Sequence, residues 1–200
     1  MKNRYAIILL MLMSFSAIAQ DKPKFGLKGG LNLSTLNYDN GYDLDWKLGF
    51  HLGALAHVHF KPSFSLQPEI YYSSQGAKIP YGNDKINRNL GYINVPVLLQ
   101  YNFRNGFRVQ GGPQIGFLLN ASDKLNGQEM STVSTSNFNK VDFSLPVGLS
   151  YLTYSGFGID GRYNIGLSNI NNNGTVKIKN SVGQLDIFYL FDHKHKAKSK

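Results

Sequence analysis

The sequence feature that most constrains the fold is an alternation of apolar and polar residues with a period of two. In residues 91–103, GYINVPVLLQYNF, every second residue from Ile93 to Phe103 is apolar or aromatic, and the residues between them include Asn94, Gln100 and Asn102. Such alternation predicts a β-strand whose two faces differ in polarity. The apolar face must therefore contact either a protein core or lipid.

The same period recurs along the chain, so we expect eight strands. They span roughly residues 25–34, 47–60, 64–73, 91–103, 107–122, 139–151, 157–168 and 181–191. The connections after the second, fourth and sixth strands are short, whereas those at about 37–46, 79–87, 123–138 and 169–180 are long and rich in Asn, Asp and Ser. Short periplasmic turns, long outer loops and an even strand number are typical of outer-membrane barrels. The sequence predicts an all-β, eight-stranded antiparallel up-and-down transmembrane β-barrel of the small outer-membrane type.

The charges of these strands fall on one face, and the opposite face is nearly uncharged. A charge on the lipid side of a barrel costs about 2–4 kcal/mol at the bilayer midplane, so the charged face should line the lumen. The expected luminal network consists of Lys28, Glu69, Arg108, Asp142, Asp160, Arg162 and Asp186. Because an unpaired buried charge is costly, we expect Glu69 to pair with Arg108 or Arg162, and Asp142 or Asp160 to pair with Arg162.

Eight strands enclose an interior that side chains about fill, so we expect a closed lumen, with a narrow ion path as the alternative. Aromatic residues near the strand ends should form the interfacial girdle of a membrane barrel. The expected girdle consists of Tyr72, Tyr101, Phe103, Phe107, Tyr151 and Phe157.

The N-terminus has the pattern of a secretory signal peptide. Lys2 and Arg4 precede the apolar run AIILLMLMSF, and the small-x-small pattern of residues 17–19 predicts cleavage before Gln20. An uncleaved anchor helix is the alternative, but the run is shorter than the roughly 20 residues that a membrane helix needs. We therefore expect a signal peptide at 1–19, a barrel domain at 20–191 and a basic periplasmic tail at 192–200. The chain has no Cys, which removes disulfides and a lipoprotein anchor from consideration.

The formal net charge of +9 comes largely from the two ends of the chain. Without two cations in the signal and four cations and one acid in the tail, 15 Lys and Arg stand against 11 Asp and Glu. The barrel domain is thus only mildly basic and has no clustered basic stripe. A nucleic-acid partner is not expected.

Three motifs that could carry chemistry have simpler explanations. GFGIDG, with Gly156, Gly158 and Gly161, matches G-x-G-x-x-G but opens a strand, so it lacks the helix N-terminus that binds a pyrophosphate. His51, His57 and His59 share the inward face of one strand, and His57 with His59 could hold a metal, although luminal hydrogen bonding explains these histidines as well. No G-x-S-x-G motif is present for a membrane hydrolase. We expect no enzyme activity, no cofactor and no metal.

Five ordered blocks of the sequence resemble a known family. FGLKGGLNLSTL, LQPEIYYSSQGAK, YINVPVLLQYNF, GFRVQGGPQIGFLLNASDK and RYNIGLSNI are similar to successive blocks of the outer-membrane β-barrel proteins of Bacteroidetes, the PorT-like or "porin family" proteins. The resemblance covers nearly the whole mature chain and implies an eight-stranded barrel, in a family whose members often lack an assigned activity and of which a few are implicated in protein secretion or gliding. Members usually end at the aromatic residue of the last strand, whereas here DHKHKAKSK follows Phe191.

These observations predict a monomeric outer-membrane barrel with a structural or interaction role. Its partners would be outer-membrane lipid and an unknown protein or envelope component, contacted through the outer loops 123–138 and 169–180 because loops are least committed to packing. The alternatives are a docking component of a PorT-like secretion or gliding apparatus and, third, a soluble periplasmic barrel that binds a small ligand.

Overall fold

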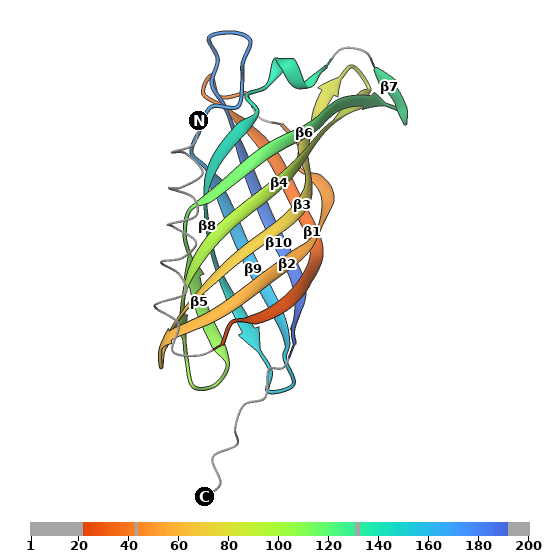
Figure 1. Ribbon diagram of the computed structural model, residues 1–200. Helices are drawn as coiled ribbons and strands as arrows, with labels where there is room; N and C mark the ends of the chain where they lie inside the picture. Colours follow the sequence, from red (N-terminus) through yellow and green to blue (C-terminus); the bar gives the residue numbers. More distant parts are fainter. Residues whose placement is uncertain (1–21, 43, 131–132, 192–200) are drawn as a thin grey trace, which may run out of the picture.

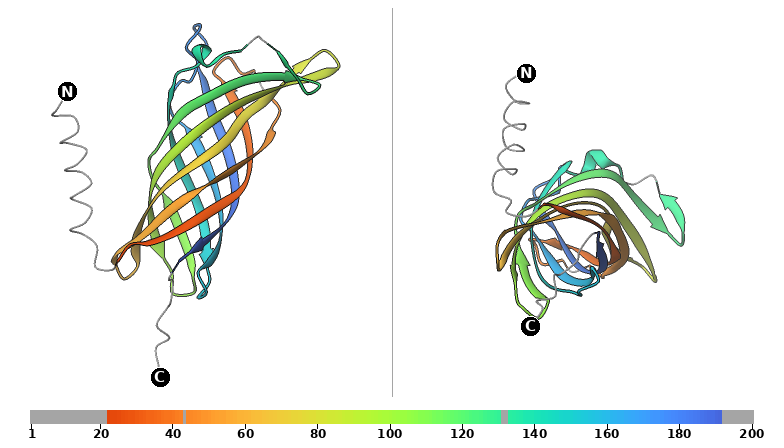
Figure 2. Two further views of the ribbon diagram at one scale, coloured as in Figure 1. Left: turned by 45° about the vertical axis from the view of Figure 1, so that its right-hand side comes forward. Right: turned by 60° about the horizontal axis from the view of Figure 1, so that its bottom comes forward.

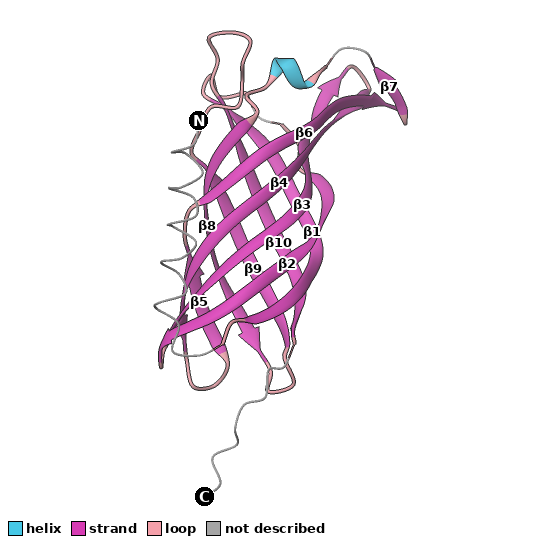
Figure 3. Ribbon diagram, in the orientation of Figure 1, coloured by secondary structure: helices cyan, strands magenta, loops and turns pink. Residues whose placement is uncertain are grey.

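The computed structural model describes residues 22–42, 44–130 and 133–191, so the expected signal peptide and the basic tail lie outside the described residues. The described chain is almost entirely antiparallel sheet (Figures 1 and 3). Its strands are β1 (Lys24–Tyr38), β2 (Lys47–Lys61), β3 (Phe64–Tyr81), β4 (Asp84–Asn102), β5 (Phe107–Gly111), β6 (Gln114–Leu125), β7 (Gln128–Met130), β8 (Val141–Leu152), β9 (Phe157–Gly166) and β10 (Ile178–Leu190), with a 3-10 turn, η1 (Thr135–Asn137). Within these ranges, no helix is long and apolar enough to cross a membrane.

The sheet closes into a barrel of eight strands. β1 pairs with β2 on one side and with β10 on the other, and every further neighbour around the ring is antiparallel. β5 and β6 act as the two parts of one barrel strand, because both pair with β4 and both pair with β8. Pro113, which has no N–H to give to a ladder, lies in the break between them. The predicted fold class and strand number are confirmed.

The prediction of a long loop at 79–87 is wrong. β3 and β4 continue to a tight turn, and the last pair of their ladder joins Tyr81 to Asp84. Gly82 has a φ of 60°, a left-handed conformation that glycine adopts without steric cost. The polar residues of this stretch favour a loop, but they belong to the tip of a hairpin that extends beyond the ring (Figures 1 and 2).

The outer ends of β3, β4 and β6 together form a sheet that projects from one side of the barrel mouth. β4 pairs with β6 from Ile86 to Pro96, and β7 adds a short strand to the far edge of β6. In Figure 2 this sheet stands clear of the ring, at the end opposite to the short turns. The expected loop 123–138 therefore includes regular structure, namely the end of β6, β7 and η1.

The two faces of the wall differ in polarity as the alternation predicts. In β9, exposed and buried residues alternate without a break from Phe157 to Gly166. The exposed residues include Ile159, which is 57% exposed, whereas the neighbouring Asp160 is 1% exposed. A continuous apolar outer surface would promote aggregation in water, but it is the surface that a membrane barrel presents to lipid.

Candidate functional site: a closed lumen and its outer end

The seven residues predicted for the luminal network are all buried inside the barrel. Their exposed fractions lie between 1% and 5%. They come from six elements, β1, β3, β5, β8, β9 and β10, so the network joins parts of the chain that are far apart in sequence. Each occupies an inward position of its strand, which the period of two determines.

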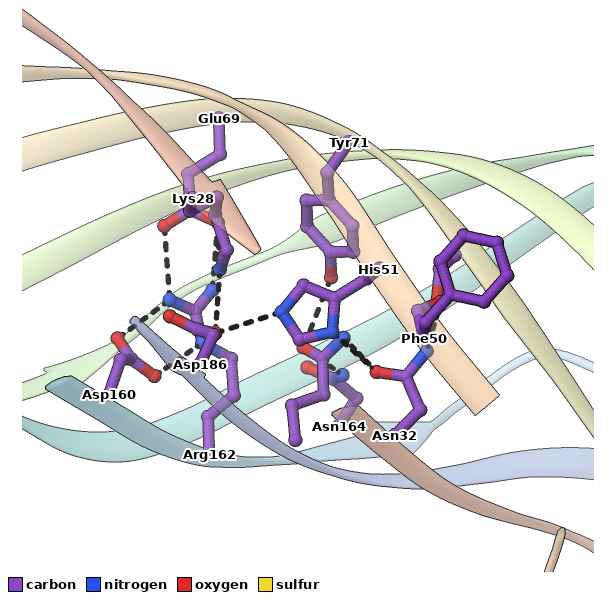
Figure 4. Close-up of polar contacts among 12 residues, drawn as sticks. Lys28, Asn32, Phe50, His51, Glu69, Tyr71, Asp160, Arg162, Asn164 and Asp186 are labelled. Atoms are coloured by element: carbon purple, nitrogen blue, oxygen red, sulfur yellow. Dashed lines mark hydrogen bonds and ion pairs between the residues drawn. The ribbon is translucent and has the colours of Figure 1, made fainter. Parts of the chain in front are cut away.

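Arg162 is the centre of this network (Figure 4). Its Nη1 donates to Oε2 of Glu69 at 2.9 Å and its Nη2 donates to Oδ2 of Asp160 at 2.7 Å. Its Nε donates to the second oxygen of Asp160 at 2.9 Å. A planar guanidinium suits such paired contacts with carboxylates. Arg162 thus links two carboxylates, and both pairs are among those that the sequence predicted.

Lys28, on β1, joins the same network. Its Nζ lies 3.0 Å from Oε2 of Glu69 and 3.1 Å from Oδ2 of Asp186. The ring of His51 extends the chain of contacts, with Nε2 3.1 Å from Asp186 and Nδ1 2.7 Å from Oδ1 of Asn32. Figure 4 shows these side chains pointing toward one another from different strands. His51 therefore makes the luminal hydrogen bonds that the sequence predicts for the histidines of this strand, and it extends the network beyond the seven charged residues expected there.

Two other predicted partners do not meet. Asp142 does not pair with Arg162, because it lies at the outer end of β8, whereas Arg162 is in the middle of β9. It instead accepts hydrogen bonds from Oγ of Ser168 at 2.6 Å and Nδ2 of Asn180 at 2.8 Å. Arg108 does not pair with Glu69, and its Nη1 has no hydrogen-bond partner within the described part of the chain.

Neutral amide side chains fill the space around the charges. Gln100 donates to Gln67 at 3.0 Å and to Gln110 at 2.7 Å, and Gln110 donates in turn to Asp160. In the same interior, the hydroxyl of Tyr71 donates to the side-chain oxygen of Gln114 at 2.7 Å. Of these residues, the sequence analysis noted only Gln100, as a member of the polar face of its strand. Their inward parity is the signal that could have identified them as part of the network.

Apolar side chains gather toward both ends of the lumen, which the sequence analysis did not predict. The outer apolar cluster has a buried core of Leu36, Leu44, Ala77, Leu90, Tyr92, Leu118, Phe138, Ile170 and Ile178. The periplasmic apolar cluster consists of Leu55, Leu152, Phe188 and Leu190. The polar network thus lies between a larger apolar cluster at the outer end and a smaller group of four apolar residues toward the periplasmic end.

Ordered loops hold the outer apolar cluster in place. Phe138 follows η1 and is 4% exposed, and the backbone N–H of the next residue, Asn139, donates to the carbonyl of Ile170 at 2.8 Å. Arg88 lies over the ring of Phe138, 5.7 Å from its centroid, and makes two hydrogen bonds to Asp123 at 2.8 and 3.0 Å. The outer end is therefore a packed structure with its own core.

Five of the six predicted girdle residues lie at the periplasmic end, beside the short turns. Tyr101 and Phe103 have ring centroids 4.9 Å apart, and those of Phe107 and Tyr151 are 5.1 Å apart. Phe157 contacts a further ring, Tyr189, at 4.7 Å. The assignment of Tyr72 to a strand end is wrong, because β3 continues to Tyr81 and leaves Tyr72 in the middle of the strand, where its ring lies 5.8 Å from that of Phe50.

The histidines singled out as possible metal ligands lie close together. The rings of His57 and His59 meet edge to face, with centroids 4.5 Å apart. Across residues 22–42, 44–130 and 133–191, no group of three or more His, Cys, Asp or Glu side chains is arranged to hold a metal ion. The pair by itself gives too few ligands for the four-coordinate sites that zinc favours.

Comparisons with known proteins agree with this architecture. The model of the outer membrane protein beta-barrel domain family matches residues 18–172. Among solved structures, Neisserial surface protein A is similar, with 13% identity over 84% of this chain and 99% of that one and a TM-score of 0.56. Ail, the attachment invasion locus protein of Yersinia pestis, is 20% identical over 86% of this chain and 100% of that one, with a TM-score of 0.54. No curated protein matches.

The family model covers more than half of the chain, and the two solved structures share its fold. The predicted outer-membrane location is confirmed, because the matched family is an outer-membrane protein family. A soluble periplasmic barrel, the third alternative, is set aside on this ground. The chain belongs to the outer membrane protein beta-barrel domain family.

Proposed function

We propose that this protein is a non-conducting barrel that anchors an interaction surface on the outer face of the outer membrane. The observation that carries the proposal is the outer end, where a projecting sheet and ordered loops pack around the outer apolar cluster. A surface held by its own core can present fixed side chains to a partner without an ordering cost at binding. The proposal includes no catalytic step.

The tip of the projecting sheet offers groups that suit an interface. Tyr81 is 57% exposed beside the β3–β4 turn, and Tyr42 is 49% exposed on the β1–β2 loop. Lys85 and Asp45 form an exposed ion pair at 2.6 Å in the same region. Exposed aromatic residues with a polar rim are typical of protein interfaces. The partner surface that we propose is therefore centred on the β3–β4 hairpin, in addition to the loops predicted from the sequence.

Site-specific photo-cross-linking in intact cells tests this proposal. A photoreactive amino acid at position 81 should give a discrete cross-linked product, because this position lies at the outer tip. Position 154 provides a matched control, since Tyr154 is 76% exposed on a periplasmic turn. Products from position 154 and none from position 81 would contradict the proposal.

The resemblance to PorT-like proteins supplies a narrower alternative, in which the barrel is a docking component of a secretion or gliding apparatus. Docking from the periplasm would use the short turns, such as Thr153–Gly156, and would give the reverse cross-linking pattern.

Planar-bilayer recording tests the closed lumen separately. We expect no steady openings, and long openings of large conductance would be the contrary result.

A further inference from the structure

A hollow lies on the lipid-facing wall of the barrel, in addition to the buried contacts of the lumen. Its volume is about 480 Å³, and it lies where β5, β8, β9 and β10 run side by side. The outward-facing residues that line it, here called the wall groove, are Phe107, Val147, Leu149, Tyr151, Ile159, Gly161, Tyr163 and Leu185. Sites for small ligands commonly have volumes of about 300–1,000 Å³, so the groove is large enough to hold part of a ligand.

Gly161, a residue of the GFGIDG stretch, lines the wall groove. Gly161 pairs with Leu149 on β8 and with Leu185 on β10, so a row of large side chains is interrupted at one position. A Cβ added at Gly161 would meet no other heavy atom within 4 Å. The missing side chain therefore leaves open space between the two leucines, which are 59% and 67% exposed.

The chemistry of the groove suits a hydrocarbon chain. Its outward-facing residues carry no charge, and the groove is continuous with the apolar wall that faces lipid. The atoms that line a hollow lack van der Waals partners on its open side, so filling the hollow with a hydrocarbon chain adds dispersion contacts. Acyl chains surround this wall at high concentration, whereas a second copy of the protein is dilute, so mass action favours a lipid occupant.

The position of the groove indicates which lipid it contacts. Phe107 and Tyr151 line one end of it, and they belong to the girdle at the periplasmic rim. Arg104 is exposed on the turn that precedes Phe107 and places a positive charge at the same level. A phosphate at the membrane surface would be attracted to this cation. We infer that the wall groove binds one acyl chain of a phospholipid of the periplasmic leaflet.

Photo-labelling of the folded protein tests this inference. The probe is phosphatidylethanolamine with a diazirine in one acyl chain, in vesicles of phosphatidylethanolamine and phosphatidylglycerol. Adducts mapped by mass spectrometry should concentrate on residues 147–163. The substitution Gly161→Leu fills the hollow and should lower this yield about threefold, a modest change because dispersion contacts alone are lost.

Gly183→Leu is the matched control. Gly183 is on the neighbouring strand and does not line the groove, and the nearest atom to an added Cβ is 3.8 Å away. Heat-modifiable migration on a gel should show that both variants fold. If Gly161→Leu does not fold, Gly161→Ala adds one carbon into open space and should still lower the yield.

Two results would overturn the inference. Labelling spread evenly around the barrel wall, unchanged by Gly161→Leu, would show that no chain is held in the groove. The chain has no Cys, so Gly161→Cys places a single thiol in the groove. A disulfide-linked dimer of this variant formed in vesicles would assign the groove to a second copy of the protein.

Discussion

The middle of the lumen and the outer end of the barrel use the same strands, but they fill the inward positions with opposite chemistry. In β10, Asp186 faces the middle of the lumen, whereas Ile178 on the same face belongs to the outer apolar cluster. The outward face of β10 changes from apolar to charged in the same direction, from the exposed Ile187 to the exposed Lys179. The polarity of each face is thus exchanged along the strand, across a stretch where the consecutive residues Asn180, Ser181 and Val182 are all buried.

The exchange of polarity follows the solvent outside the wall. Where lipid surrounds the barrel, apolar side chains face outward and the polar ones must satisfy one another inside. Where the strands pass beyond the membrane, water surrounds them and an ordinary apolar core forms inside. The two regions therefore differ in what stabilises them, charge pairing in the first and apolar burial in the second. Four substitutions test this difference.

The largest effect is expected in the luminal network. Arg162→Met removes the cation that both Glu69 and Asp160 contact, and it leaves these carboxylates buried with fewer partners. Breaking a buried pair in this way costs about 3–5 kcal/mol in the free energy of unfolding. Urea unfolding in lipid vesicles, followed through the fluorescence of Trp46, the only tryptophan, measures it.

Lys61→Met is the control for that substitution. Lys61 is exposed at the periplasmic end of β2, so its replacement should change the free energy of unfolding by less than about 0.5 kcal/mol. Equal effects of the two substitutions would mean that the luminal pairs contribute nothing beyond a surface charge.

The second substitution acts on the outer apolar cluster. Leu90 is fully buried there, and Leu90→Ala should cost about 2–3 kcal/mol through the lost contacts and the cavity. Because the projecting sheet has its own core, the loss should be local. Hydrogen exchange should become faster in the outer ends of β3, β4 and β6 and stay unchanged in β9. Faster exchange throughout the ring would show that the two regions unfold together.

The difference between the two regions also explains which features of the fold and of the luminal network can be predicted from the sequence. The period of two determined which residues of each strand face inward, and this was enough to predict the barrel and the burial of residues such as Arg162 and Asp160. It did not determine how far along the axis each residue lies. That depends on strand tilt and stagger, which is why Asp142 was paired with the wrong region.

The outer end was harder to predict because its core comes from separated residues. Phe138 and Ile170 are single apolar residues within polar segments, so neither produces a periodic signal. The β3–β4 hairpin was missed for a similar reason, since Lys85 and Asn87 made its tip look like a loop. Beyond the membrane the polar residues face outward, and a rule based on an apolar outer face no longer applies.

The third substitution tests where the polarity is exchanged. Ile187→Lys places a charge on the lipid-facing wall, where Ile187 is 67% exposed, and should cost about 2 kcal/mol at an intermediate depth in the bilayer. Lys179→Leu makes the reverse change on the outer part of the same strand and should alter the free energy of unfolding by less than about 0.5 kcal/mol. Similar costs for both would place Lys179 within the membrane rather than beyond it.

The smallest effect is expected for an ion pair outside the lumen. Lys85 and Asp45 lie 2.6 Å apart, closer than Lys28 and Glu69 at 3.0 Å, but their side chains are 57% and 47% exposed. Water screens such a pair, so Asp45→Asn should change the free energy of unfolding by less than about 0.5 kcal/mol despite the shorter distance.

Glu69→Gln, the matched change inside the lumen, leaves the cations Lys28 and Arg162 with a neutral partner and should cost several times more. Unfolding in low and high salt separates the two cases further, because salt weakens the exposed pair and reaches the buried one much less. If Asp45→Asn proved as costly as Glu69→Gln, distance rather than burial would govern these pairs, and the contrast between the lumen and the outer end would fail.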